Sequence, residues 1–209
     1  GANVLATDLV MAGTAQRAFC NVRPPGHHAE RQRAMGFCFF DNVAVGAAHA
    51  MDVHGLERVA ILDFDVHFGN GTADIFRNEH RELLCSTYEY PLYPGINPPT
   101  IPRQSINCPL PAGSDGAAFR QAVTDYWIPA LENFAPQMIF VSAGFDAHAR
   151  DPLADLRLSV DDYAWITEMI CEIAARHSQG RIVSTLEGGY DLPTLATCAA
   201  AHIEKLLNA

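Results

Sequence analysis

Short apolar runs of strand length recur along this chain, and segments with helical spacing separate most of them. The apolar runs cover 18–22, 59–64, 83–87, 106–109, 138–142 and 182–186, and the helical patterns cover 2–16, 41–53, 115–134, 160–176 and 192–207. Continuous apolar strands are typical of sheets that are covered on both faces. The pattern therefore predicts an α/β fold with a mostly parallel sheet between layers of helices.

The chain has 209 residues, which is enough for one domain with a sizeable core. No internal repeat, low-complexity tract or linker divides it, so we expect residues 1–209 to form a single domain. The sequence begins with Gly1 rather than Met and enters a helical pattern at once. We therefore expect a domain that is incomplete at its N-terminus.

Composition narrows the classes of partner. Lys and Arg number 14 against 24 Asp and Glu, a formal charge of −10, so the chain lacks the basic excess of a phosphate-backbone binder. We expect no direct contact with nucleic acid and, since no apolar run is long enough to cross a bilayer, none with a membrane. The six cysteines are widely spaced and form no CxxC pair. They indicate buried free thiols in a reducing compartment, for which we expect the cytoplasm.

The most distinctive polar segment, DFDVHFGNGT at 63–72, follows the apolar run at 59–64. Asp63, Asp65 and His67 alternate, so in an extended chain they project to one side, and two of them could share a cation. Carboxylate oxygens and imidazole nitrogens are ligands of zinc and related ions. The alternative is a strand end whose carboxylates cap the next helix.

A second strand end supplies another acid. Asp146 follows the run at 138–142 and could converge on the first ligands, leaving a coordination position open for water, as in catalytic metal sites. A turn or cap residue is an equally good interpretation of Asp146 alone. His148 could compete as a ligand, but we rank it lower.

Two further clusters also follow apolar runs. His27 and His28 are adjacent in a loop stiffened by proline and glycine, and imidazoles beside a metal could act as general base and acid. Asp63 and Asn70 are candidates to orient them. Tyr190 follows the run at 182–186 and could donate a hydrogen bond to a developing oxyanion. Without the metal motif, a surface histidine pair and an exposed turn tyrosine would explain both clusters.

Taken together, these segments resemble the histone deacetylase superfamily, and most closely its class II-like bacterial branch and the related acetylpolyamine amidohydrolases. The matching segments follow the order of the family and extend across almost the whole chain: RPPGHHAE (23–30), GFCFFDN (36–42), DFDVHFGNGT (63–72), YPLYPG (90–95), SAGFDAHARDPLADL (142–156) and LEGGYDL (186–192).

The resemblance implies an arginase/deacetylase-like three-layer α/β/α fold that lacks N-terminal elements. It also implies a catalytic Zn²⁺ held by Asp65, His67 and Asp146. His28 would then be the general base and acid, with His27 its electrostatic partner, and Tyr190 would polarise the substrate carbonyl.

The resemblance further implies a narrow channel for the arm of an acyl-lysine. Its expected residues are Phe37 and Tyr93 as walls and Gly36 at the rim. Asp63 would support His27 and, together with Ser86, would contribute to a structural K⁺ site.

Two departures bear on chemistry and substrate. Asn70 stands where class I members have Asp, so His28 should be less basic than in class I. Leu153 stands where polyamine-specific members have a glutamate, which weakens attraction for a second ammonium group.

The sequence therefore predicts a zinc-dependent deacetylase that hydrolyses the amide of N-acetyl-lysine or a related acylated amine and releases acetate. The alternatives are an acetylpolyamine or small-amide amidohydrolase and a catalytically impaired acyl-lysine-binding fragment. An arginase-type dinuclear centre would need further bridging carboxylates. We also carry a homo-oligomer as an expectation, although no feature of the sequence indicates one.

Overall fold

A computed structural model describes residues 1–209 and contains one sheet of six strands, all parallel. The strands are β1 (Arg17–Cys20), β2 (Val59–Asp63), β3 (Glu82–Glu89), β4 (Ser105–Leu110), β5 (Met138–Ala143) and β6 (Ile182–Leu186), in the spatial order β1-β6-β5-β2-β3-β4. The predicted α/β class is confirmed, and the sheet is entirely rather than mostly parallel.

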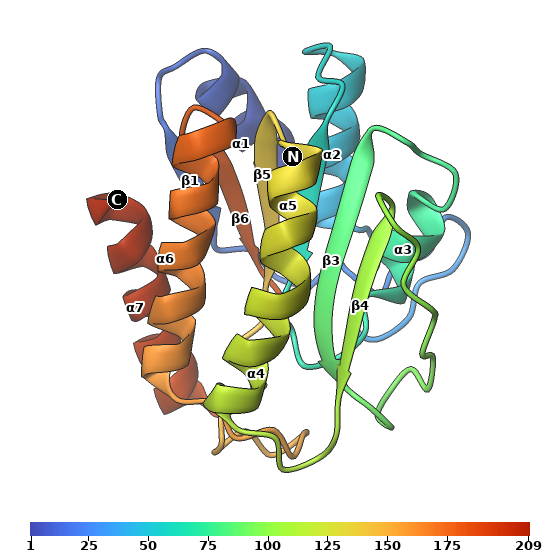
Figure 1. Cartoon of the computed structure of the whole chain (residues 1–209), viewed down its shortest axis with the longest axis vertical. Helices are drawn as coiled ribbons and strands as arrows, with labels where there is room; N and C mark the ends of the chain where they lie inside the picture. Colours follow the sequence, from blue (N-terminus) through green and yellow to red (C-terminus); the bar gives the residue numbers. More distant parts are fainter.

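Helices cover both faces of the sheet (Figure 1). They are α1 (Ala2–Met11), α2 (Asn42–Asp52), α3 (Asn70–Ile75), α4 (Gly116–Ala122), α5 (Ile128–Phe134), α6 (Val160–His177) and α7 (Leu192–Asn208). Along β2 the side chains alternate: Val59 and Ile61 pack with α1 and α2, whereas Ala60 and Leu62 pack in the larger core with α4 to α7. Because both faces are buried, β2 is apolar up to its last residue.

The predicted helix starts are confirmed by their caps. The carboxylate of Asp41 accepts a hydrogen bond from the Ala44 amide, and that of Asp115 accepts one from the Ala118 amide. Ser159 opens α6 with a capping box. Each cap satisfies amide groups that the first helical turn leaves without an intrahelical partner.

The helix predicted over 115–134 differs from the observed structure. A π-helical turn, Val123–Trp127, separates α4 from α5. Pro129 stands in the first turn of α5 and has no N–H, and its ring would crowd the carbonyl four residues earlier, so the wider turn accommodates it. The helix predicted over 2–16 ends at Met11, and Gly13 follows with a φ of 72°.

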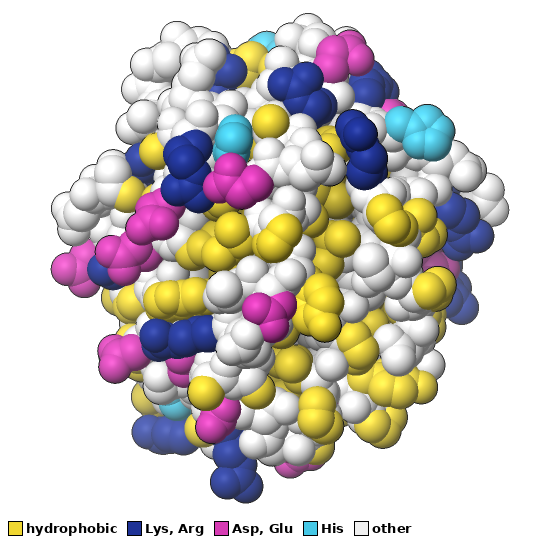
Figure 2. Space-filling view, in the orientation of Figure 1, with side chains coloured by type: hydrophobic (Ala, Val, Ile, Leu, Met, Phe, Trp, Pro, Cys, Tyr) yellow, Lys and Arg dark blue, Asp and Glu magenta, His cyan; other side chains and the backbone are white.

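The surface carries charges of both signs, and the thiols are free and buried as expected from the sequence. Charged side chains of both signs are interspersed among apolar ones on the face that carries α4 to α7 (Figure 2). All six cysteines are free and buried. None of the helices combines the length and apolar character needed to cross a membrane.

Candidate active site

The polar clusters predicted from the sequence meet at one edge of the sheet. Strands β1, β6, β5 and β2 are consecutive neighbours and parallel, so the loops that follow them leave the sheet together. The register pairs Asp63 at the end of β2 with Ser142 of β5, and Ser142 with Thr185 of β6. This edge at the carboxyl ends of the strands is where α/β sheets bind ligands.

Asp65, His67 and Asp146 form a compact group whose ligand atoms lie within 4.8 Å of one another. The Nδ1 atom of His67 lies 3.0 Å from Asp65 Oδ1 and 3.3 Å from Asp146 Oδ2. Both carboxylates are buried, and His67 is partly exposed. Two buried carboxylates this close are stabilised by a positive charge between them or by a shared proton.

The carboxylates are held by the backbone as well. Asp65 Oδ2 accepts a hydrogen bond from the Gly188 amide at 2.8 Å, and Asp146 Oδ1 accepts one from the Val66 amide at 2.9 Å. Asp146 Oδ2, by contrast, is buried, accepts no backbone hydrogen bond and has only the Nδ1 atom of His67 beside it, at 3.3 Å. A buried carboxylate oxygen that shares one imidazole nitrogen with a second carboxylate fits the donor set of a zinc ion.

The charges in this group are strongly coupled. Burial raises the pKa of Asp146 to about 6, with the negative charge of Asp65 adding to the effect. Burial favours neutral His67, but hydrogen bonds to Asp146 and Asp65 outweigh it and raise the pKa of His67 to about 10. A protonated His67 therefore supplies the positive charge between the carboxylates that a bound cation would otherwise supply.

Gly188 allows the loop after β6 to approach these carboxylates. A Cβ atom at this position would overlap Asp146 Oδ2 and lie 2.6 Å from Asp65 Oδ2. Glycine is thus required here by close approach rather than by backbone conformation.

His27 and His28 lie beside this group with different partners. His27 Nδ1 is 2.9 Å from Asp63 Oδ2, and His28 Nδ1 is 2.8 Å from Asn70 Oδ1. Their ring centroids are 4.1 Å apart, and both rings are buried. The histidine pair is therefore not a surface feature, and each ring is oriented by one of the two partners predicted from the sequence.

The surroundings of the two imidazoles give them different charge states. Burial alone would lower the pKa of His27, but the negative charges of Asp65 and Asp63 raise it well above 6.5. Burial and the neighbouring positive charge of His27 lower the pKa of His28 to about 3. His28 is thus a neutral ring that donates Nδ1–H to Asn70 and leaves Nε2 with a lone pair.

A cavity of about 410 Å³ opens above these groups. Its lining includes every channel and catalytic residue expected from the sequence, namely His27, His28, Gly36, Phe37, Tyr93, Leu153 and Tyr190. Two of the three expected metal ligands, Asp65 and His67, also line it, together with Pro25, Leu92 and Gly188. The Tyr93 ring stands edge-on to His28 with centroids 5.0 Å apart, and the Phe37 and Tyr190 centroids are 6.3 Å apart. Aromatic walls around a polar base are typical of a pocket for a chain-like substrate.

Ser86 and His148 lie outside the cavity. Ser86 is buried on β3 directly beside Asp63, and its hydroxyl oxygen has no hydrogen-bond partner. An orphaned hydroxyl next to a buried carboxylate fits an oxygen-ligated cation site. His148 accepts a hydrogen bond from the Arg150 amide and is absent from the group around Asp146, in agreement with its lower rank.

Two acids that support the site were not singled out from the sequence. Glu187 is buried, and its Oε2 accepts hydrogen bonds from the amides of Gly26 and His27 at 2.6 and 3.2 Å. Asp151 Oδ2 accepts one from the Tyr190 amide at 2.7 Å. Both acids fix loops that carry candidate catalytic residues. The sequence offered one signal for Glu187, its position immediately after an apolar strand, and none for Asp151.

The family model of the histone deacetylase domain matches residues 1–206. The chain belongs to the histone deacetylase family. Its fold agrees with this assignment, because the solved structure of the HD domain of HDA15 superposes with a TM-score of 0.89 at 31% identity, covering 98% of this chain and 60% of that one.

Relatives within the histone deacetylase family come from distant sources. The histone deacetylase-like amidohydrolase of Pseudomonas aeruginosa is 43% identical, covering 99% of this chain and 56% of its own length. The chloroplastic histone deacetylase 10 of rice is 42% identical, covering 100% of this chain and 49% of its own length. The chain thus spans about half the length of these curated relatives. Because bacterial and plant proteins match about equally well, the bacterial branch stays a prediction.

Human HDAC10, which carries the name polyamine deacetylase, is also related. It is 33% identical over a match that covers 100% of this chain and 32% of the human protein. The family therefore includes members named for different acylated amines.

Proposed function

We propose that this chain carries the catalytic centre of a zinc-dependent deacetylase that hydrolyses N-acetyl-lysine or a related acylated amine and releases acetate. The observation that carries the proposal is the buried group of Asp65, His67 and Asp146, in which both carboxylates share the Nδ1 atom of His67, next to a neutral His28 at the base of an aromatic cavity. Membership in the deacetylase family supports the reaction class.

Zinc would be held by Asp65, His67 and Asp146, and it would supply Lewis acidity toward the amide carbonyl and toward water. His67 would bind it through Nδ1, the nitrogen that now lies between the two carboxylates. The protonated ring would lose its proton on loading, because a ligand nitrogen needs its lone pair.

His28 performs the proton transfers in this proposal. Its Nδ1–H is engaged by Asn70, so Nε2 is available to take a proton from the attacking water and return it to the departing amine nitrogen. His27, held by Asp63, adds fixed positive charge beside the reacting atoms. That charge favours the oxyanion that develops on the substrate carbonyl.

Tyr190 and the aromatic walls act on the substrate itself. The Tyr190 hydroxyl would donate a hydrogen bond to the carbonyl oxygen as it becomes negative, and Asp151 holds the backbone of that loop. Phe37 and Tyr93 would pack against the methylene chain of an acyl-lysine and exclude water from it.

Separately, a K⁺ ion coordinated near Asp63 and Ser86 would stabilise the end of β2.

The proposal is tested by measuring acetate release from an acetyl-lysine peptide and from acetylated spermidine with protein stripped of metal and reloaded with Zn²⁺. We expect turnover that a chelator abolishes, with the peptide preferred. His28→Ala and Asp146→Ala should each reduce turnover by at least about 10²-fold. His148→Ala is the matched control, since it removes an imidazole two residues from Asp146 that lies outside the group, and it should retain activity.

Two results would count against this function. Turnover retained in both His28→Ala and Asp146→Ala would remove the assigned chemistry. Tight binding of acetyl-lysine peptide with no acetate release by the zinc-loaded protein would favour a non-catalytic acyl-lysine-binding module instead.

A further inference from the structure

A second group of metal-ligand side chains lies at the opposite edge of the sheet from the active site. It consists of Asp8 on α1, His49 on α2 and His54 in the turn after α2. The turn after α2 leads into the first residue of β2, whereas Asp65 and His67 follow the last. The two groups are therefore separated by the length of β2, whose five residues extend over about 13 Å.

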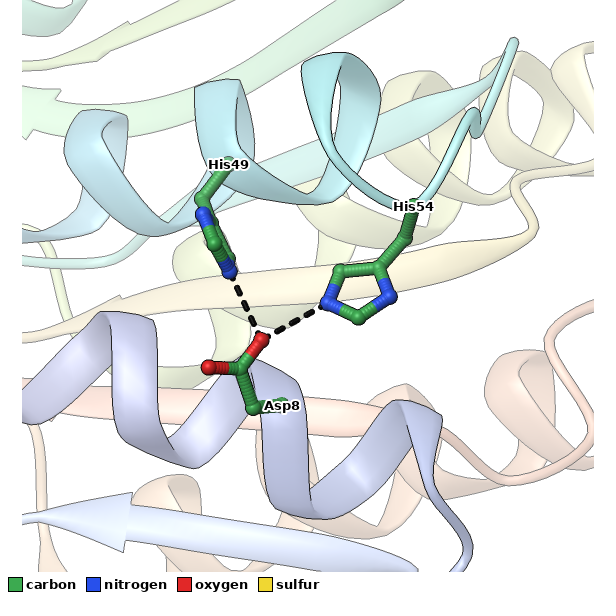
Figure 3. Close-up of side chains that lie close together, drawn as sticks. All are labelled: Asp8, His49 and His54. Atoms are coloured by element: carbon green, nitrogen blue, oxygen red, sulfur yellow. Dashed lines mark hydrogen bonds and ion pairs between the residues drawn. The ribbon is translucent and has the colours of Figure 1, made fainter.

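The three side chains converge on one point (Figure 3). His49 Nε2 lies 2.7 Å and His54 Nε2 lies 2.8 Å from the same oxygen, Asp8 Oδ1. The ring centroids of the two histidines are 5.2 Å apart with an angle of 81° between the planes. Both nitrogens thus point inward toward the carboxylate from different directions.

Local structure explains the convergence. Helices α1 and α2 approach closely because alanines, including Ala6 and Ala47, lie between them in the core. The chain leaves α2 with Leu56 donating back to the Ala50 carbonyl and with Gly55 at a φ of 69°. This left-handed residue, which favours glycine, turns the chain away directly after His54, so that His54 stays beside the last turns of α2.

The chemistry of the group suits a transition-metal ion better than the hydrogen bonds it now makes. Two imidazole nitrogens and a carboxylate oxygen are ligands that zinc and its neighbours prefer, whereas Ca²⁺ and Mg²⁺ prefer oxygen alone. In a tetrahedral zinc site with bonds of about 2.0 to 2.1 Å, ligand atoms stand about 3.3 Å apart. The two nitrogen–oxygen distances therefore need to open by only about half an ångström, and the two nitrogens already lie within 4.8 Å of each other.

Exposure of the side chains permits this opening. The side chains of His49, His54 and Asp8 are 19%, 24% and 48% exposed, so the carboxylate can swing outward and water can complete the coordination. Ligands from two helices and a turn would then be joined by the ion.

We propose that Asp8, His49 and His54 form a second binding site for a divalent transition-metal ion of the zinc type, independent of the active site. The ion links α1 to the C-terminal end of α2. It therefore stabilises the helical layer that packs against this face of the sheet.

The test counts Zn²⁺ bound by metal-stripped protein, using equilibrium dialysis with elemental analysis and titration calorimetry. The double variant His49→Gln/His54→Gln should bind one equivalent fewer than the wild type. Asp8→Asn should lower the affinity for that Zn²⁺ ion by at least about tenfold. The matched control is His177→Gln, which removes an imidazole that contacts a single carboxylate, Glu132, at 2.7 Å; it should bind as the wild type does.

The difference between the numbers of Zn²⁺ ions bound by the wild type and by the double variant keeps this result separate from the proposed function. If the active site binds zinc, the wild type binds two equivalents and the double variant one. If the active site does not bind zinc, the wild type binds one and the double variant none. Circular dichroism of the metal-stripped variants checks that they fold, and the gentler Asp8→Asn change covers the case in which the double variant does not.

Thermal unfolding gives an independent readout. Zn²⁺ at about a hundredfold excess over its Kd should raise the Tm of the wild type by roughly 5 °C more than that of the double variant. The proposal is overturned if the double variant and the wild type bind the same number of ions with the same affinity. In that case the three side chains serve only as a hydrogen-bonded link between α1 and α2.

Discussion

The Nδ1 atom of His28 lies 2.8 Å from the amide oxygen of Asn70, whereas the Nδ1 atom of the adjacent His27 lies 2.9 Å from the carboxylate of Asp63. Two neighbouring imidazoles thus have one neutral and one charged partner. The negative charges of Asp65 and Asp63 keep His27 cationic, whereas burial and the positive charge of His27 keep His28 neutral. The division of roles proposed for the pair depends on this difference in charge.

Replacing Asn70 with Asp should make His28 more basic. A carboxylate 2.8 Å from Nδ1 favours the imidazolium form, so the pKa of His28 should rise by about 1 to 3 units. Because a general base acts when deprotonated, the acidic limb of the kcat/KM profile should move to higher pH. The pH dependence of acetate release measures this, and an unchanged acidic limb would argue against His28 as the base.

Tyr190→Phe should reduce catalysis without preventing binding. The hydroxyl is proposed to act mainly on the developing oxyanion, so kcat should fall by about 10² to 10³-fold while KM changes little. Steady-state kinetics with an acetyl-lysine peptide separate the two parameters. A large rise in KM with unchanged kcat would instead assign the tyrosine to substrate binding.

Gly188→Ala should disrupt metal binding. The added methyl group would overlap Asp146 Oδ2 and crowd Asp65, so the carboxylates must move, and Zn²⁺ affinity should fall by at least about tenfold. Gly1→Ala is the control, because no atom lies within 4 Å of its added methyl group and it is not among the glycines with a left-handed backbone. Equal zinc affinity in both variants would show that the loop after β6 yields instead of the ligands.

Leu153→Glu should shift preference toward acetylated polyamines. Leu153 lines the cavity and is 46% exposed, so a carboxylate there would face solvent and attract a second ammonium group at the rim. An exposed pair contributes about 0.2 to 1 kcal/mol, which corresponds to a few-fold change in the ratio of kcat/KM values. Leu153→Gln, similar in size but neutral, should leave that ratio unchanged.

His202 should make stability depend on pH. Its ring is fully buried between the hydroxyls of Thr167 and Ser184, and burial lowers its pKa to about 3. As pH falls from 6.5 toward 3, the unfolded chain binds a proton that the folded chain does not, so this contribution to stability is present above pH 6.5 and is lost on acidification.

Below about pH 6 the contribution of His202 to the free energy of unfolding should fall by about 1.4 kcal/mol for each unit of decrease in pH. The variant His202→Gln should lack this component, so its free energy of unfolding should fall less steeply. Urea denaturation at several pH values measures both slopes. Equal slopes for the two proteins would show that His202 becomes protonated in the folded state.

Several parts of the fold were predictable because the signals are local. Apolar runs located the strands, and the helical patterns that begin at 41 and 160 start where Asp41 and Ser159 form short-range caps. The π-helical turn before Pro129 was not predicted, because helical periodicity does not distinguish α from π hydrogen bonding over a single turn.

By itself, the sequence determined which chemical groups follow the strands, including Asp65, His67 and Asp146, and hence the donor types that the site offers. Only the tertiary structure decided which groups meet. Glu187 contacts the amide of His27 across 160 residues, and Asp8 meets His54 across 46. Such contacts depend on strand order and helix packing, which long-range burial of apolar surface fixes and which no local pattern in the chain records.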